Sequence, residues 1–144
     1  MTASYVFSLA NTFALAGWII LIFGIVRKRP FWRDAVAGTW WPLALSALYT
    51  LLVVSFFFKA KGGFDSLDNV QLLFTAPWVA LAGWVHYLAF DLFVGAWISR
   101  RVMEVGLPRL LLIILLPLTF MFGPVGFLAF HVCRMAFSKV EASQ

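Results

Sequence analysis

The sequence contains little charge. Only 12% of its 144 residues are charged, whereas 63% are hydrophobic, and the mean hydropathy is +0.95. A water-soluble domain of this size needs far more charge to cover its surface. The composition therefore excludes a water-soluble globular protein and predicts an integral membrane protein. Because a membrane-spanning helix needs roughly 20 apolar residues, the chain is long enough for about four spans with short connections.

Cysteine and the common catalytic motifs are also scarce. Cys133 is the one cysteine in the sequence, so no internal disulfide can form. Paired cysteines, a Glu-x-x-His pair, a phosphate-binding loop and a Gly-x-Ser-x-Gly elbow are all missing from the sequence. His86 and His131 differ in expected depth by roughly 12 Å at 1.5 Å per residue, so one metal ion cannot take both. We therefore expect no metal site and no cofactor.

The net charge of +5 arises from eleven Lys and Arg against six Asp and Glu. The basic residues gather between the apolar runs. This distribution is typical of residues that orient membrane helices and not of a nucleic-acid-binding surface. No nucleic-acid partner is expected, and membrane lipids are the expected surroundings.

Four nearly charge-free stretches predict membrane-spanning helices near 4–26, 38–58, 75–98 and 110–133. Asp91 is the one charged residue within these ranges. The first run has neither the basic flank nor the cleavage site of a signal peptide, so it is interpreted as a retained span. The prediction is an all-α integral membrane four-helix bundle that forms a single transmembrane domain over residues 1–144.

The basic residues predict an orientation, because Lys and Arg favour the cytoplasmic side. The first and third loops carry seven of them, and the second loop and the tail carry four. Both termini are therefore expected to face away from the cytoplasm. The two groups are Arg27, Lys28, Arg29, Arg33, Arg100, Arg101 and Arg109 against Lys59, Lys61, Arg134 and Lys139.

Asp91 is the most informative residue, because an ionisable group at bilayer depth is costly and usually faces protein or water. It lies roughly 10 Å inside the hydrocarbon boundary at 1.5 Å per residue. Trp84, Tyr87 and Asp91 fall on one helical face, so the phenol or the indole can bond the carboxyl group. Two interpretations stay open, a polar contact between helices and a proton donor or acceptor in a ligand pocket.

His86 precedes Asp91 by five residues, so the two side chains point roughly 140° apart at about 100° per residue. They do not form a simple dyad. Tyr49 of the second span lies at the depth of His86, which indicates a polar layer near the bilayer midplane. A packing histidine bonded to a neighbouring helix is the alternative to a ligand-binding one. Asn11 in the first span is interpreted as a contact between helices.

The fourth span contains residues that bend or break helices. Pro117 and Pro124 each remove a backbone hydrogen bond, and Gly123 and Gly126 flank the second proline. Phe120 and neighbouring phenylalanines make this region aromatic. The pattern predicts a broken helix whose aromatic side faces the third span, suited to a long apolar or polyene ligand, although phenylalanine in a span is also common as filler.

Two segments resemble a known family. The run from Leu81 to Phe93 reads Leu-Ala-Gly-Trp-Val-His-Tyr-Leu-Ala-Phe-Asp-Leu-Phe, and a Pro-Val-Gly element begins at Pro124. Together they resemble the small multi-span membrane family named for the plant abscisic-acid-deficient protein implicated in neoxanthin synthesis. The similarity is best over about 67–133, and its motif residues are Trp84, His86, Asp91, Leu92, Phe93, Pro124, Val125 and Gly126.

The resemblance implies four helices and the isomerisation of the epoxycarotenoid violaxanthin to neoxanthin. Opening an epoxide needs a proton delivered to oxygen and one taken from carbon, for which a neutral carboxylic acid and an imidazole are suitable. Asp91 and His86 are the candidate catalytic residues. The candidate ligand-binding residues are Trp84, Tyr87, Tyr49, Phe120, Pro124 and Gly126.

The expected ligand is a carotenoid or another isoprenoid bound within the bilayer. The alternative function is a non-enzymatic pigment-binding or structural subunit of a membrane complex, and a homo-oligomer is equally compatible with the sequence. The chain has no plastid transit sequence, so the bacterial inner membrane is the expected location.

Overall fold

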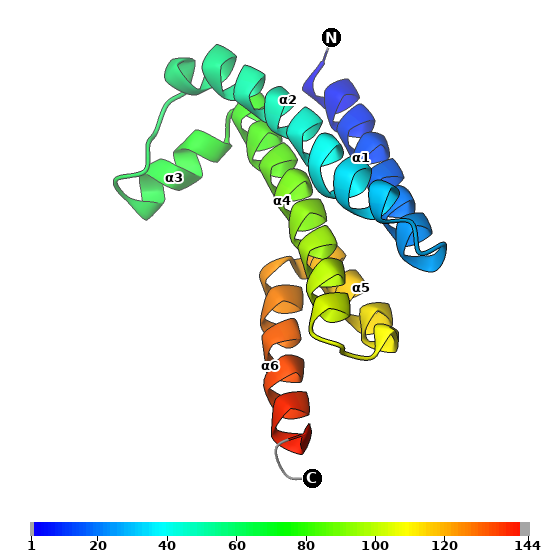
Figure 1. Ribbon diagram of the computed structural model, residues 1–144. Helices are drawn as coiled ribbons and strands as arrows, with labels where there is room; N and C mark the ends of the chain where they lie inside the picture. The colour runs from blue at the N-terminus through cyan, green and yellow to red at the C-terminus, as the bar shows by residue number, and fades with distance from the viewer. Residues whose placement is uncertain (1, 142–144) are drawn as a thin grey trace.

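The computed structural model describes residues 2–141, with side chains up to residue 137, and all of its regular structure is helical (Figure 1). The all-α prediction is confirmed for these residues. A π-helical stretch, Phe31–Trp40, leads directly into the second helix. The six α-helices are α1 (Ala3–Val26), α2 (Trp41–Phe56), α3 (Leu67–Phe74), α4 (Pro77–Glu104), α5 (Leu112–Phe122) and α6 (Pro124–Glu141).

Three helical segments are long and apolar enough to cross a membrane. They are α1, the continuous run Phe31–Lys59 that contains α2, and α4. Their ranges overlap those expected near 4–26, 38–58 and 75–98, and α4 extends six residues beyond the last of these. Each contains an apolar stretch of at least 18 residues with at most two charged side chains, and a helix satisfies its own backbone hydrogen bonds where lipid offers no partner.

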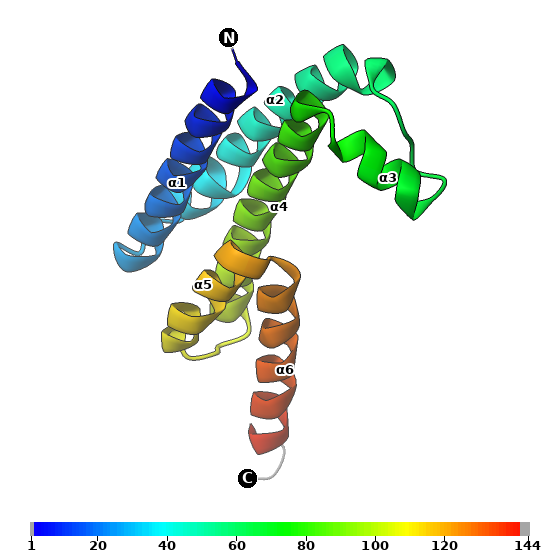
Figure 2. The same ribbon diagram turned by 180° about the vertical axis from the view of Figure 1, so that it is seen from behind.

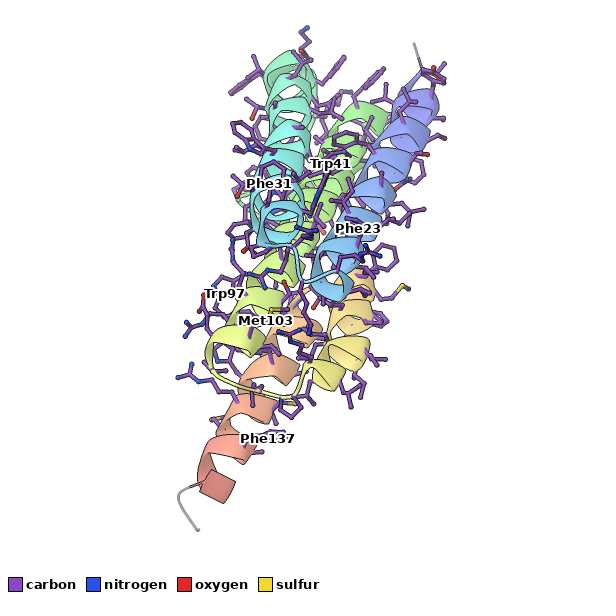
Figure 3. All side chains as sticks on the ribbon, turned by 45° about the vertical axis from the view of Figure 1, so that its right-hand side comes forward. Phe23, Phe31, Trp41, Trp97, Met103 and Phe137 are labelled. Carbon is purple, nitrogen blue, oxygen red and sulfur yellow. The ribbon has the colours of Figure 1, made fainter. Side chains whose placement is uncertain are left out.

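Helix α4 is the central element, because α1, α2, α3, α5 and α6 all contact it (Figures 1 and 2). Small residues bring the helices close. A Cβ atom on Gly95 would lie 2.5 Å from the buried ring of Trp18, and one on Gly17 would lie 2.6 Å from Leu92. Trp41 lies at the contact between α1 and α2, where its indole N–H donates to the Phe13 carbonyl at 2.7 Å (Figure 3). These contacts fix the three crossing helices relative to one another.

The predicted fourth span near 110–133 is wrong as a single helix. Helix α5 ends at Phe122, and α6 begins at Pro124 after a reversal of the chain at Gly123 (Figure 2). Gly123 has φ +29°, a conformation that side chains disfavour, and Pro124 has no N–H with which to continue α5. With 11 residues, α5 is about 16 Å long at 1.5 Å per residue, roughly half the hydrocarbon core. The α5–α6 pair is therefore a hairpin, and the four-helix bundle is not confirmed.

The reversal places the two termini at opposite ends of the molecule (Figure 1). This arrangement does not support the expectation that both termini face the same side. One end of the molecule, called the basic end below, is formed by the end of α1, the start of the π-helical stretch and the end of α4. It holds Arg27, Lys28, Arg29, Arg33, Arg100, Arg101 and Arg109.

Helix α6 runs back toward the basic end and carries Arg134 with it. The sequence of α6 also includes Lys139, whose side chain lies outside the described residues. The opposite end holds Lys59 and Lys61. The folded chain is therefore more asymmetric in basic residues than the loop count indicates.

Candidate functional site

The four predicted site residues of α4 point in different directions. Asp91 and Tyr87 face the α5–α6 hairpin, Trp84 faces α1, and His86 faces α2. This follows from the helical spacing of about 100° per residue. The structure thus separates the two candidate catalytic residues, Asp91 and His86, so no proton can pass directly between them.

Asp91 is enclosed by the hairpin and is only 6% exposed. Its Oδ1 lies so close to Gly123 that a Cβ atom on that glycine would overlap it. The Tyr87 hydroxyl, one helical turn before Asp91, donates to the Met121 carbonyl at 2.6 Å. Asp91 Oδ2 has no hydrogen-bond partner among the described residues.

The Met121 carbonyl needs a donor because the helix break removes the one that a continuous helix would supply. In an unbroken helix this carbonyl would accept from the N–H four residues on, at Val125. Tyr87 takes the place of that donor. This bond joins α4 to the hairpin beside Asp91.

His86 lies on the α2 side of α4, in an aromatic pocket of about 390 Å³. Its ring is 5.4 Å from the Tyr49 ring and stacks on Phe90 at 4.6 Å. Neither the imidazole nor the Tyr49 hydroxyl has a hydrogen-bond partner among residues 2–137. The lining of this His86 pocket is Tyr49, Val53, Phe57, Phe58, Phe64, Leu73, Phe74, Val79, Ala82, Gly83 and His86.

Helix α3 closes the His86 pocket from the end opposite the basic end. Ser66 caps α3 by accepting from the Asn69 N–H at 3.2 Å, which fixes where this helix starts. Phe74 then packs on Gly83, where a Cβ atom would lie 2.7 Å from the Phe74 ring. The missing side chain of Gly83 therefore lets α3 rest against α4 above His86.

A second pocket of about 260 Å³ follows the same seam between α2 and α4 toward the basic end. Phe90 lines it and stacks on His86, so the two pockets meet at this pair. Together they form what we call the α2–α4 groove. Along the second span it extends from Gly38 to Phe57, roughly 28 Å at 1.5 Å per residue and close to the thickness of the hydrocarbon core.

Trp84 contributes to the contact between α1 and α4. Its indole N–H donates to Asn11 Oδ1 at 2.8 Å, and its ring stacks on Tyr87 at 5.5 Å. The interpretation of Asn11 as a contact between helices agrees with this bond. Trp84 remains 41% exposed on the outer surface of the molecule.

The remaining predicted ligand residues lie in the hairpin and do not line the His86 pocket. Phe120 contacts Trp18 edge to face at 5.4 Å, and Pro124 begins α6. Gly126 is buried against Thr119, which a Cβ atom would overlap. These residues shape the reversal and its contact with the crossing helices.

The sequence interpretation included Gly123 in the predicted helix break but did not place it against Asp91, and it did not single out Gly83. His131 packs among Trp97, Phe127 and Phe130, well away from the His86 pocket. Within residues 2–141, no group of three or more His, Cys, Asp and Glu side chains gathers into a metal-binding arrangement.

Three helices long and apolar enough to cross a membrane and a broken-helix hairpin are typical of a helical membrane protein, and the α2–α4 groove is its candidate site. Similarity to known sequences identifies the family within this class. The family model described as ABA DEFICIENT 4-like matches residues 5–130, so the chain belongs to the ABA4-like family and is a membrane protein related to neoxanthin synthesis. No curated protein and no solved structure matches the chain.

Proposed function

We propose that the protein binds a carotenoid or another long isoprenoid in the α2–α4 groove and isomerises it at His86. The observation that carries this proposal is a long apolar groove with two polar groups in its His86 pocket. These are the His86 imidazole and the Tyr49 hydroxyl, which have no hydrogen-bond partner among the described residues. An apolar pocket with a few convergent polar groups is the usual form of a small-molecule site. Family membership supports the class of ligand.

The dimensions of the groove favour a long ligand. A molecule lying along it extends over most of the hydrocarbon core, with its chain against the side chains of the Phe90 pocket. Its ring end occupies the His86 pocket, where the aromatic side chains Phe57, Phe64 and Phe74 surround it. Tyr49 donates a hydrogen bond to an oxygen on this ring.

For an epoxide ligand the reaction is an internal proton transfer. The carbon–oxygen bond of the epoxide breaks as its oxygen gains a proton, and an adjacent carbon loses one. The imidazole of His86 is suited to take the carbon proton, and the Tyr49 hydroxyl is suited to give its proton to the epoxide oxygen. Transfer of the proton from His86 back to Tyr49, whose ring lies 5.4 Å away, restores both side chains. Asp91 serves as a positioning residue that holds the hairpin against α4.

We also propose an orientation and a location. The basic end, joined by the end of α6, faces the cytoplasm of a bacterial inner membrane, because Lys and Arg favour that side. The N-terminus then faces away from the cytoplasm and the C-terminus faces it. The His86 pocket lies toward the non-cytoplasmic side.

The test compares two histidine variants, His86→Ala and His131→Ala. His131 lies outside the groove, so His131→Ala is the matched control. Each variant is expressed in cells that make an epoxycarotenoid, and the bound and converted pigments are separated by chromatography. Loss of a proton-transferring group typically lowers the rate about 10²–10⁴-fold. We expect this loss in His86→Ala and unchanged conversion in His131→Ala.

Pigment that stays bound but is not converted by the wild-type protein supports the non-enzymatic alternative and rejects the isomerase. Full conversion by His86→Ala rejects the role of the imidazole. Melting temperatures measured on the same samples show whether a loss of conversion reflects unfolding.

A further inference from the structure

A separate groove lies between the second half of α1 and α5, on the other side of α4 from His86. Its volume is about 440 Å³. Ile22 and Val26 line it from α1, and Leu112 and Pro117 line it from α5. Arg109 stands at its end nearest the basic end and is the one charged residue in its lining. The groove thus joins an apolar channel to a single cation.

The acidic groups at the basic end are already bound by other arginines. Asp34 accepts two hydrogen bonds from Arg33, each 2.6 Å long. Glu104 accepts from Arg101 at 2.6 Å. Among the side chains described, these are the two salt bridges, so no carboxylate neutralises Arg109.

Further positive charge follows directly on the α1 side of the groove. Val26 lines the groove, and the next three residues are Arg27, Lys28 and Arg29, all exposed. The larger groove between α1 and α2, about 860 Å³, has no charged residue in its lining. The α1–α5 groove therefore differs from the α1–α2 groove in having positive charge at one end.

We infer that the α1–α5 groove binds an anionic phospholipid, with its phosphate on Arg109 and one acyl chain between α1 and α5. Arginine pairs with phosphate through two parallel hydrogen bonds. Basic pockets between membrane helices on the cytoplasmic side are suited to anionic head groups. The apolar channel requires a chain as well as a phosphate, which selects a lipid over free phosphate.

The experiment is native mass spectrometry of the full chain, delipidated in detergent. The protein is offered an equal mixture of phosphatidylglycerol and phosphatidylcholine with identical acyl chains. We expect the wild type to retain phosphatidylglycerol preferentially. Arg109→Gln should lower this preference about five-fold, the usual effect of one basic residue near an anionic membrane surface. Lys59→Gln, at the opposite end, is the matched control and should leave it unchanged.

A second variant tests the acyl-chain part of the site. Ile113 of α5 also lines the groove. Ile113→Trp fills the groove without changing charge and should also reduce lipid retention, while its size-exclusion profile shows that it folds. Equal retention of both lipids by the wild type overturns the inference, and so does an undiminished preference in Arg109→Gln. Displacement of the lipid by millimolar inorganic phosphate would show a free-anion site and would also overturn it.

Discussion

Replacing Gly123 with alanine should destabilise the α5–α6 hairpin more than an ordinary glycine substitution. With φ +29° and ψ −81°, Gly123 lies in a backbone region that side chains rarely adopt, which costs about 1–3 kcal/mol. The new Cβ atom would also overlap Asp91 Oδ1. Overpacking of a buried contact costs typically 1–3 kcal/mol, so we expect Gly123→Ala to lose about 2–6 kcal/mol of unfolding free energy.

Gly106 provides the matched control. It has φ +72°, and no heavy atom lies within 4 Å of the position that its Cβ would occupy. Gly106→Ala therefore measures the backbone cost alone, about 1–2 kcal/mol. The larger loss expected for Gly123→Ala combines its own backbone cost with the contact with Asp91, and the double-mutant cycle separates the two.

The assay is equilibrium unfolding in mixed micelles titrated with a denaturing detergent, applied to a double-mutant cycle. Asp91→Ala removes the group that the Cβ would meet, so the double variant with Gly123→Ala should lose less than the sum of the two single losses. The expected coupling is about 1–3 kcal/mol. Equal losses for Gly123→Ala and Gly106→Ala, or strict additivity in the cycle, would refute the proposed contact.

Three further predictions follow from the same geometry. A cysteine introduced near residue 30 should react with a membrane-impermeant reagent from the cytoplasmic side, and one near residue 65 from the other side; the reverse pattern would invert the proposed orientation. Tyr87→Phe removes the donor to the Met121 carbonyl and should cost about 0.6–1.7 kcal/mol in the same unfolding titration, and an unchanged stability would contradict the capping role. Asp91→Asn should fold with nearly wild-type stability because its amide has nearly the shape of the carboxyl group and keeps a polar side chain against Gly123, whereas Asp91→Leu should be less stable; the opposite ranking would count against a polar role of Asp91 at the hairpin.

The sequence predicts the crossing helices well because their signal is local. A helix such as α1 or α4 is visible as a long run without charge, and the cost of burying charge in lipid enforces that run. The family resemblance also rests on local motifs, Trp84 to Phe93 and Pro124 to Gly126, and the family model confirms it.

The sequence does not predict the α5–α6 hairpin, because a bent helix and a reversal of the chain have the same sequence pattern. Pro117, Gly123 and Pro124 indicate that the helix is interrupted, but not the direction that the chain then takes. That direction depends on the contact of Gly123 with Asp91 and on the bond from Tyr87 to Met121, both between distant segments.

The candidate site could be predicted in part. Matching depths across antiparallel helices pairs Tyr49 with His86, and their rings lie 5.4 Å apart. The same reasoning cannot show that α3 folds over this pair, because Phe74 reaches it through a turn of the chain that only the packing on Gly83 fixes.

The exposure of His86 along the side of α4 has a consequence for how any ligand arrives. The His86 pocket lies between two segments long and apolar enough to cross a membrane, and Leu73 and Phe74 of α3 line it on the side away from the basic end. On the proposed function, we expect a ligand to enter sideways from the lipid rather than from water. Its effective concentration is its mole fraction among the lipids, so the rate should fall when the protein and pigment are diluted with additional phospholipid at constant bulk volume. Adding buffer at a constant ratio of lipid to protein should leave the rate unchanged.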